Sequence, residues 1–350
     1  MTASLGHSVL ASGWHERDCS VMTIPDAPWE SLGLLIGHAT DEAGATGCTV
    51  ILGADGPFRC GVALLGRASA TRELGTCDPS HLVDRTDAVL LTGGSAYGLD
   101  AAAGVMRWME ERQRGFPVAQ GVVPIVPAAS LFDLAPLGRF DARPTPDMAY
   151  AACAHASSRD VAEGSVGAGT GALVGKGAGV ARAMKGGVGV GVAAGAGQLV
   201  AAIAAVNAFG DVRNANSCII AGARADGGGF VDIDERTQEG VMLSQLPTTR
   251  EHTTIACVAI SACLTKLQLA QVADSATTAL RKRISPSATA FDGDVVFVIG
   301  PCTGEPAPLP VVEALAIAAL ERAIEQGVRS ARGRDGFPGL ADSTPAAGTL

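Results

Sequence analysis

The stretch Arg250-Glu-His-Thr-Thr-Ile-Ala-Cys-Val-Ala-Ile260 carries most of the information in this chain. Two threonines, Thr253 and Thr254, stand where a polar, proline-containing segment (residues 245–252) changes into a β-branched, apolar run typical of a strand. A hydroxyl at such a junction can attack the carbonyl of the preceding peptide bond. When that bond breaks, the threonine becomes an N-terminus whose own amine can act as the base, and no histidine is required.

Composition and charge limit the class of protein. The chain has 350 residues, 47% of them hydrophobic, which is enough for one large domain or two smaller ones. The net charge of −9 argues against a nucleic-acid partner. The nine cysteines are scattered without a C-x-x-C pair, which favours buried free thiols in a reducing cytoplasm over a disulfide framework. The N-terminus lacks the basic and apolar regions of a signal peptide.

One apolar stretch, residues 186–206, is as long as a membrane span. Its first half alternates glycine with valine, a period of two that predicts a strand. We therefore expect two strands joined by a turn near residues 195–197, and no association with a membrane.

Strands and helices are mixed along the chain without regular alternation, which favours a layered α+β design over a doubly wound sheet. Residues 1–20 are expected to be a flexible leader, residues 21–330 a single catalytic domain, and residues 331–350 a disordered tail. Strands are expected at residues 34–40, 48–52, 60–65, 87–91, 122–126, 199–206, 253–260 and 294–299, and helices at residues 99–112, 148–158, 264–282 and 311–326.

Two glycine-rich motifs fail the tests for well-known sites. Gly93-Gly-Ser-Ala-Tyr-Gly98 has Tyr97 where a serine-hydrolase elbow needs glycine, so a helix beginning near Ser95 is the better interpretation. The segment from Gly167 to Lys176 lacks the spacing of a phosphate-binding loop. Lys176 and Lys185 are nevertheless the only lysines of a nearly uncharged stretch, and such a lysine lies either at a rim or in a site.

Three further polar residues have both a functional and a structural interpretation. Asp292 and Asp294 flank a glycine before a strand and can orient an amine, although an Asp-Gly turn is common. Asn207 follows an apolar strand and can act as an oxyanion donor or as a strand-end cap. The six histidines show no metal-ligand spacing, so no metal is expected.

Taken in order, these stretches resemble the DmpA-like self-processing aminopeptidases, a family that also contains the nylon-oligomer hydrolases. The resemblance runs from about residue 33 to about residue 327. It rests on eight stretches: Gly37-His-Ala-Thr-Asp-Glu42, Leu91-Thr-Gly-Gly-Ser-Ala-Tyr-Gly-Leu99, Val123-Pro-Ile-Val-Pro-Ala-Ala-Ser-Leu-Phe-Asp-Leu134, Gly164-Ser-Val-Gly-Ala-Gly-Thr-Gly-Ala-Leu-Val-Gly-Lys176, Met184-Lys-Gly-Gly187, Ala205-Val-Asn207, Thr253-Thr-Ile-Ala-Cys-Val-Ala259 and Phe291-Asp-Gly-Asp294.

The resemblance implies a four-layer αββα sandwich of the DmpA and ornithine acetyltransferase type, similar to N-terminal-nucleophile hydrolases. It implies self-cleavage between His252 and Thr253 into fragments that stay associated, in a homo-oligomer of processed protomers. The implied function is hydrolysis of small peptides or amides through an acyl-enzyme, without a cofactor. The implied roles are nucleophile for Thr253, active-site lysine for Lys176, oxyanion donor for Asn207, and a carboxylate pair for Asp292 and Asp294.

Two departures bear on activity and substrate. His252 precedes the nucleophile where relatives carry asparagine or glycine, and its imidazole lies beside the bond to be cut. Phe132 stands where some members have a catalytic tyrosine, so Phe132, together with Tyr97, is a candidate for substrate binding. Two alternatives remain at this point: an acyltransferase of the ornithine acetyltransferase type, and an uncleaved paralogue without catalysis.

Overall fold

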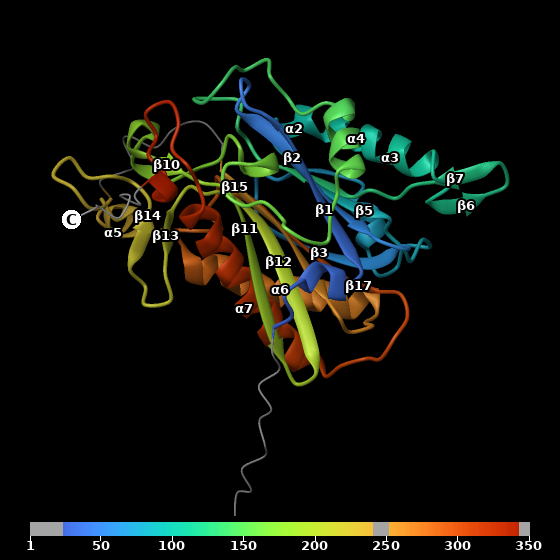
Figure 1. Cartoon of the computed structure of the whole chain (residues 1–350). Coiled ribbons are helices and arrows are strands. Elements are labelled where there is room, and N and C mark those ends of the chain that lie inside the picture. The colour runs from blue at the N-terminus through green and yellow to red at the C-terminus, as the bar shows by residue number, and fades with distance from the viewer. Residues whose placement is uncertain (1–23, 241–251, 343–350) are drawn as a thin grey trace, which may run out of the picture.

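Two five-stranded sheets pack face to face in the computed structural model, which describes residues 24–240 and 252–342 (Figure 1). The first sheet has the order β1 (Leu34–Asp41), β2 (Thr46–Gly53), β5 (Ala88–Thr92), β8 (Ala128–Ser130) and β4 (Ala70–Arg72). The second sheet has the order β11 (Val188–Gly195), β12 (Gln198–Asn207), β15 (Thr253–Ile260), β17 (Gly293–Pro301) and β3 (Phe58–Gly66).

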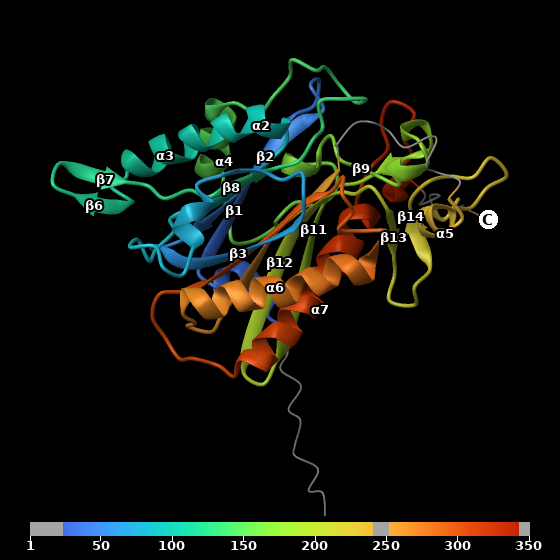
Figure 2. The same cartoon turned by 180° about the vertical axis from the view of Figure 1, so that it is seen from behind.

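Helices cover the outer face of each sheet (Figure 2). α3 (Ala102–Glu110) and α4 (Pro146–Ala154) pack on the first sheet, and α6 (Lys266–Arg283) and α7 (Leu309–Arg329) pack on the second. Three apolar clusters result, one between the sheets and one beneath each helix pair. This arrangement confirms the expected α+β class and its four layers.

The remaining elements are short and lie mostly in the connections between layers. They are α1 (Pro28–Ser31), α2 (Ser95–Gly98), α5 (Ile233–Gln238), β6 (Phe116–Val118), β7 (Gly121–Val123), β9 (Leu173–Val174), β10 (Met184–Lys185), β13 (Asp211–Arg213), β14 (Ile219–Ala221) and β16 (Ile284–Ser285). α2 begins at Ser95, as the sequence predicted.

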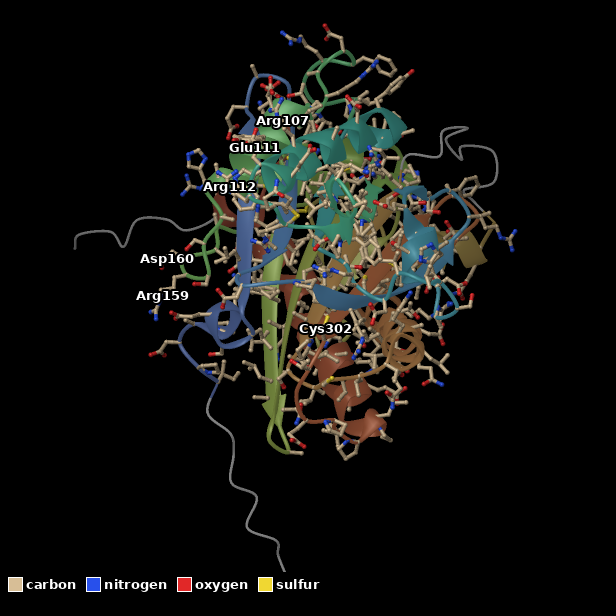
Figure 3. The ribbon with its side chains drawn as sticks, turned by 90° about the vertical axis from the view of Figure 1, so that its right-hand side faces the viewer. Arg107, Glu111, Arg112, Arg159, Asp160 and Cys302 are labelled. Atoms are coloured by element: carbon tan, nitrogen blue, oxygen red, sulfur yellow. The ribbon has the colours of Figure 1, made fainter. Side chains whose placement is uncertain are left out.

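The outward side of the first helical layer is polar. Arg107 of α3 donates to Asp147 of α4 at 2.7 Å, and the Tyr150 hydroxyl donates to Glu111 at 2.6 Å. Figure 3 shows Arg107, Glu111 and Arg112 together at this surface. These exposed pairs add little stability, so apolar contact with the sheet holds α3 and α4 in place.

The strand that begins at Thr253 lies in the middle of the second sheet. All eight residues of β15 are buried, and β15 pairs antiparallel with β12 and parallel with β17. Strand β12 also forms a hairpin with β11, which confirms the two strands expected within residues 186–206. Within the described residues, no helix is long and apolar enough to cross a membrane.

One prediction about local order needs correction. Residues 331–342 are not disordered: Pro338 accepts a hydrogen bond from the Lys185 N–H, Arg334 pairs with Phe337, and a 3-10 turn covers Leu340–Asp342. The expected leader (residues 1–20) and residues 343–350 lie outside the described residues.

The cysteines fit their prediction only in part. Eight are described, and all are free thiols. Cys218 is exposed, and Cys263 and Cys302 are half-buried, because they lie in loops and at a strand end rather than inside a layer. The other five are buried, as the sequence predicted: Cys48, Cys60, Cys77, Cys153 and Cys257.

Candidate active site

Thr253 is the first residue of β15 and lies opposite Asn207, the last residue of β12. The adjacent strand β17 contributes Asp294, whose Oδ1 accepts a hydrogen bond from the Thr254 N–H at 2.6 Å. Thr253 is 5% exposed, Asn207 1% and Asp294 3%. Three strands that are far apart in the sequence thus bring a hydroxyl, an amide and a carboxyl group together at one end of the buried sheet.

The peptide bond before Thr253 is held on both sides of its carbonyl oxygen. The His252 oxygen accepts a hydrogen bond from Thr253 Oγ1 at 2.6 Å and another from the Gly293 N–H at 3.0 Å. A side chain at position 293 would come within 2.5 Å of the Ala68 carbonyl oxygen, so glycine is needed for this close approach. An N–H directed at a carbonyl oxygen can stabilise the oxyanion that forms when the carbonyl carbon is attacked.

Lys176 reaches the same place from the glycine-rich segment. It follows Gly175, whose φ of 75° is a left-handed conformation, and begins a 3-10 turn. Its buried Nζ donates to Asn207 Oδ1 at 2.8 Å and to the Asn207 carbonyl oxygen at 3.0 Å. The positive charge therefore lies next to the residue that is paired with Thr253.

The Asn207 side chain connects several parts of the site. Its Oδ1 also accepts from the Leu173 N–H at 3.0 Å, and its Nδ2 donates to the Phe132 carbonyl oxygen at 2.9 Å. The structure thus brings Phe132 to the site through its backbone. The oxyanion role of Asn207 stays a prediction, whereas a role in positioning Lys176 follows directly from these contacts.

Asp292 and Asp294 form a closely coupled pair of buried carboxyl groups. Burial raises the pKa of Asp294 well above its ordinary value, and the neighbouring Asp292 raises it further. Burial also raises the pKa of Asp292, although its Oδ2 accepts a hydrogen bond from the Thr289 N–H at 2.8 Å. Two neighbouring buried carboxyl groups do not readily ionise together.

His252 is buried beside the bond, in surroundings that favour the neutral form of its imidazole. Burial lowers the pKa of His252 to about 2, with a further contribution from the Lys176 charge. Neither ring nitrogen has a hydrogen-bond partner among the described residues. The ring packs edge-on against Phe209, with the centroids 5.0 Å apart.

Tyr97 is the candidate that the described contacts connect least to the others. Its side chain is 55% exposed on α2, and its ring stacks on the Arg143 guanidinium at 3.6 Å. Its role in substrate binding stays a prediction.

Lys185 belongs to a second buried cluster, which the sequence did not assign. Its Nζ donates to the carbonyl oxygens of Thr170 at 3.0 Å and Ala172 at 2.7 Å, and burial lowers the pKa of Lys185 to about 7. Asp133 lies nearby and accepts hydrogen bonds from Thr46 Oγ1 at 2.7 Å and from the Gly94 N–H at 2.6 Å. Lys185 and Asp133 therefore tie the two glycine-rich motifs to the sheets.

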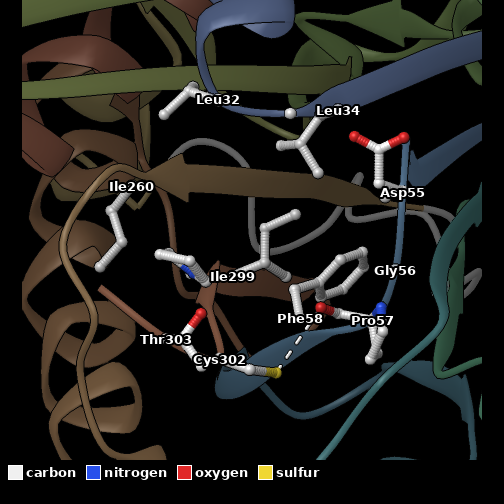
Figure 4. A pocket seen from close by; sticks show the side chains of 14 residues that line it. Leu32, Leu34, Asp55, Gly56, Pro57, Phe58, Ile260, Ile299, Cys302 and Thr303 are labelled. Atoms are coloured by element: carbon white, nitrogen blue, oxygen red, sulfur yellow. Dashed lines mark hydrogen bonds between the residues drawn. The ribbon is translucent and has the colours of Figure 1, made fainter.

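An open pocket of about 360 Å³ lies at the other end of β15, away from Thr253. Leu34, Phe58, Ile260, Ile299 and Cys302 are among the residues that line it, and Figure 4 shows the side chains. Asp55 is the one charged side chain among its lining residues, so the pocket lacks the combination of lysine, amide and paired carboxyl groups found beside Thr253. Within the described residues, no group of histidine, cysteine, aspartate or glutamate side chains could hold a metal ion.

Sequence reasoning did not identify Gly293, Phe209 or Phe291 as parts of the site. Gly293 could have been found, because it stands between the two nominated aspartates. Phe209 meets the His252 ring and stacks on Phe291 only after the chain has folded, and nothing in the local sequence of Phe209 marks it.

Comparison with known proteins agrees with this geometry. The family model described as peptidase family S58 matches residues 31–340. The chain belongs to this family. It is therefore a hydrolase of peptide and related amide bonds, and the resemblance to DmpA-like aminopeptidases is confirmed.

Among curated relatives, an uncharacterized aminopeptidase of Mycobacterium tuberculosis strain H37Rv is 39% identical over 344 residues, covering 90% of this chain and 97% of the relative. A 6-aminohexanoate-oligomer endohydrolase of Kocuria sp. strain KY2 is 29% identical over 293 residues, covering 76% of this chain and 72% of the relative.

Solved structures share the fold. The L-aminopeptidase D-Ala-esterase/amidase from Ochrobactrum anthropi, described as a variant of the Ntn hydrolase fold, matches with a TM-score of 0.66 at 18% identity, covering 89% of this chain and 88% of that one. A Burkholderia sp. β-aminopeptidase matches with a TM-score of 0.62 at 19% identity, covering 87% of each chain.

Proposed function

We propose that the chain cuts its own bond between His252 and Thr253, and that Thr253 is then the N-terminal nucleophile of an amide hydrolase. The fragments would be residues 1–252 and 253–350. The observation that carries the proposal is the environment of the His252 carbonyl oxygen, which lies within hydrogen-bonding distance of Thr253 Oγ1 and the Gly293 N–H. The nucleophile and an oxyanion donor are thus both positioned at the bond before any cut is made.

Self-cleavage proceeds in two balanced steps. Thr253 Oγ1 adds to the His252 carbonyl carbon, its proton passes to the Thr253 nitrogen, and the C–N bond breaks to leave an ester and a free amine. Water then hydrolyses the ester, which gives a His252 carboxylate and restores the Thr253 hydroxyl. The Gly293 N–H stabilises the oxyanion in both steps, and one such donor is worth about 3–4 kcal/mol.

Hydrolysis of a substrate reuses the same groups. The Thr253 amine accepts the proton of its own hydroxyl as Oγ1 attacks the substrate carbonyl, and the proton then passes to the leaving amine. An α-amine ordinarily titrates at about 7.7–8.0, and the neighbouring Lys176 charge favours its neutral form. Asp292 and Asp294 orient the amine, and Asn207 keeps Lys176 in place. Water releases the acid from the acyl-enzyme.

The substrate class that we propose is small: amino-acid amides, short peptides of α- or β-residues, or oligomers of ω-amino acids. The names of the relatives support this range, since they include aminopeptidases and an oligomer hydrolase. They do not favour the acyltransferase alternative. We further propose a cytoplasmic homo-oligomer of processed protomers.

Intact mass measurement of freshly purified protein tests self-cleavage. We expect two fragments, of which the second begins at Thr253. A chain that stays whole after prolonged incubation would support the uncleaved paralogue, and a fragment that begins at Thr248, Thr249 or Thr254 would refute the choice of nucleophile.

A product assay separates hydrolysis from acyl transfer. The processed protein is incubated with an amino-acid amide in buffer that contains no amine acceptor. We expect free amino acid to accumulate with steady turnover. Release that requires an added amine would instead identify an acyltransferase.

A further inference from the structure

The His252 side chain fills a space walled by the Phe209 ring, next to the peptide bond that we propose is cut. Only 2% of the residue is exposed, and its ring nitrogens lack hydrogen-bond partners within the described chain. The ring packs against Phe209 in a T-shaped arrangement, and Phe209 in turn stacks on Phe291 at an interplanar angle of 29°, with the centroids 6.0 Å apart. Packing rather than hydrogen bonding therefore holds the imidazole, so these surroundings suit a flat or apolar group.

Phe209 forms a fixed wall of this place. It is 3% exposed and packs with Ala223 and Ile233 in a small apolar cluster. Its carbonyl oxygen accepts the Gly177 N–H at 3.0 Å, and a side chain at Gly177 would come within 2.9 Å of the Phe209 ring. The wall is thus close-packed from behind by the same turn that carries Lys176, and it cannot retreat without disturbing that turn.

A substrate has to enter where His252 now lies. Strand β15 fixes Thr253 Oγ1 and strand β17 fixes the Gly293 N–H, so a substrate carbonyl must occupy the position of the His252 carbonyl to meet both. The side chain next to that carbonyl then points where the imidazole points. Thr253, Asp292 and Asp294 are each at most 5% exposed in the uncut chain, so room for a substrate is gained by removing His252.

We propose that the place vacated by the His252 side chain is the acyl-side pocket of the processed enzyme, with Phe209 and Phe291 determining its specificity. The pocket selects amides whose acyl residue carries an uncharged aromatic or apolar side chain, such as phenylalanine or leucine. It disfavours a lysine-like side chain, because a buried ammonium without a partner loses its hydration and lies near the Lys176 charge. This inference rests on the proposed function.

The test uses processed enzyme and the p-nitroanilides of phenylalanine, leucine, alanine and lysine. We expect kcat/KM for the phenylalanine and leucine substrates to exceed that for alanine by about tenfold or more, with lysine the poorest, since a filled apolar pocket discriminates by this amount. In Phe209→Ala the ratio of kcat/KM between the phenylalanine or leucine substrate and the alanine substrate should fall to about one, whatever the overall turnover of the variant. Phe116→Ala, on the distant β6–β7 hairpin, is the matched control and should keep the preference.

Self-cleavage provides a second readout that needs no substrate. His252→Phe should be processed about as fast as the native chain, whereas His252→Lys should be processed about tenfold more slowly or not at all. Phe291→Leu keeps an apolar wall, and serves if Phe209→Ala fails to fold; it should lower the preference for phenylalanine over leucine.

The outcomes separate this inference from the function on which it rests. Turnover of all four substrates with a preference that Phe209→Ala and Phe291→Leu leave unchanged would overturn the pocket and leave the proposed function intact. Equal processing of His252→Phe and His252→Lys would also overturn the pocket. A chain that is never cut and never releases product would overturn the proposed function itself.

Discussion

The two ends of strand β15 differ: one holds a cluster of buried polar side chains, and the other borders an open pocket. At its beginning, Thr253 lies among Lys176, Asn207 and two aspartates, all of them buried. At its end, Ile260 lines an open and largely apolar pocket of about 360 Å³. The lining of the open end includes a single charged side chain, Asp55, whereas the closed end holds several charged groups out of water at an energetic cost. The comparison teaches that buried charged side chains, and not the size of a pocket, mark the proposed reactive end of β15.

The adjacent threonines give the largest expected effect. Thr253→Ala removes the proposed nucleophile, so both self-cleavage and hydrolysis should fall by about 10⁴-fold or more. Thr254→Val is the matched control, because the Thr254 hydroxyl is buried and has no hydrogen-bond partner among the described residues. That variant should be processed and active, as gel analysis and p-nitroanilide turnover would show. Loss of activity in Thr254→Val with retention in Thr253→Ala would reverse the assignment.

Substitution of the two buried lysines should distinguish a residue that acts in catalysis from one that stabilises the fold. Lys176→Met should lower kcat/KM by about 10²–10³-fold, because it removes the charge beside the proposed nucleophile. Lys185→Met should chiefly lower the free energy of unfolding, by about 2–3 kcal/mol, because the Thr170 carbonyl oxygen loses the Lys185 donor and the Ala172 carbonyl oxygen keeps only the Gly186 N–H. Chemical denaturation and steady-state kinetics on both variants check the pair. Similar profiles for the two lysines would contradict the division of roles.

A pH effect should single out the carboxyl pair. The folded chain raises the pKa of Asp294, so above the ordinary value of 3.8 the folded state keeps a proton that the unfolded state has lost. The free energy of unfolding therefore falls as pH rises through that window. Asp294→Asn removes the titrating carboxyl group and with it this pH dependence. The free energy of unfolding of the variant relative to the parent should therefore rise with pH, by no more than about 1.4 kcal/mol per pH unit.

Urea unfolding in a Thr253→Ala background, which keeps the chain whole, measures this difference across about pH 5 to pH 8. Asp78→Asn is the control, since Asp78 lies on the surface and its pKa is lowered rather than raised. A stability difference that is independent of pH would show that Asp294 is ionised in the folded chain.

The smallest effect is expected at the far end of β15. The half-buried Cys302 thiol donates a hydrogen bond to the Pro57 carbonyl oxygen, at 3.5 Å. Cys302→Ser should change the free energy of unfolding by no more than about 0.5 kcal/mol and leave turnover unaltered. A marked loss of turnover in this variant would mean that the open pocket takes part in the reaction.

Much of the fold follows from local patterns in the sequence. The hairpin at residues 188–207, the buried strand at residues 253–260 and the long helices α6 and α7 show their periodicity or apolar runs directly. The order of strands in a sheet depends on contacts between distant residues, so the parallel pairing of β15 with β17 was not evident. The ordered segment 331–342 was missed because its hydrogen bonds go to backbone groups elsewhere, such as the Lys185 N–H.

Some residues of the candidate site could likewise be predicted from the sequence, and others could not. Thr253, Lys176, Asn207, Asp292 and Asp294 could be nominated from the family resemblance, and the structure places them close together. The Gly293 N–H and the Phe209 ring were missed. A backbone amide has no sequence signature, and an aromatic residue becomes a wall only when another segment packs on it.

The central position of β15 in its sheet has a consequence for how the proposed fragments would stay associated and refold. Two strands from after position 252, β15 and β17, lie side by side between β12 and β3, which come from before it. The two proposed fragments would therefore be interleaved, and they could part only by global unfolding. Before the cut the chain refolds as a single molecule, whereas afterwards renaturation becomes a second-order encounter that slows on dilution. Processing would thus leave the folded structure unchanged, but unfolding of the cut protein would be effectively irreversible at low concentration.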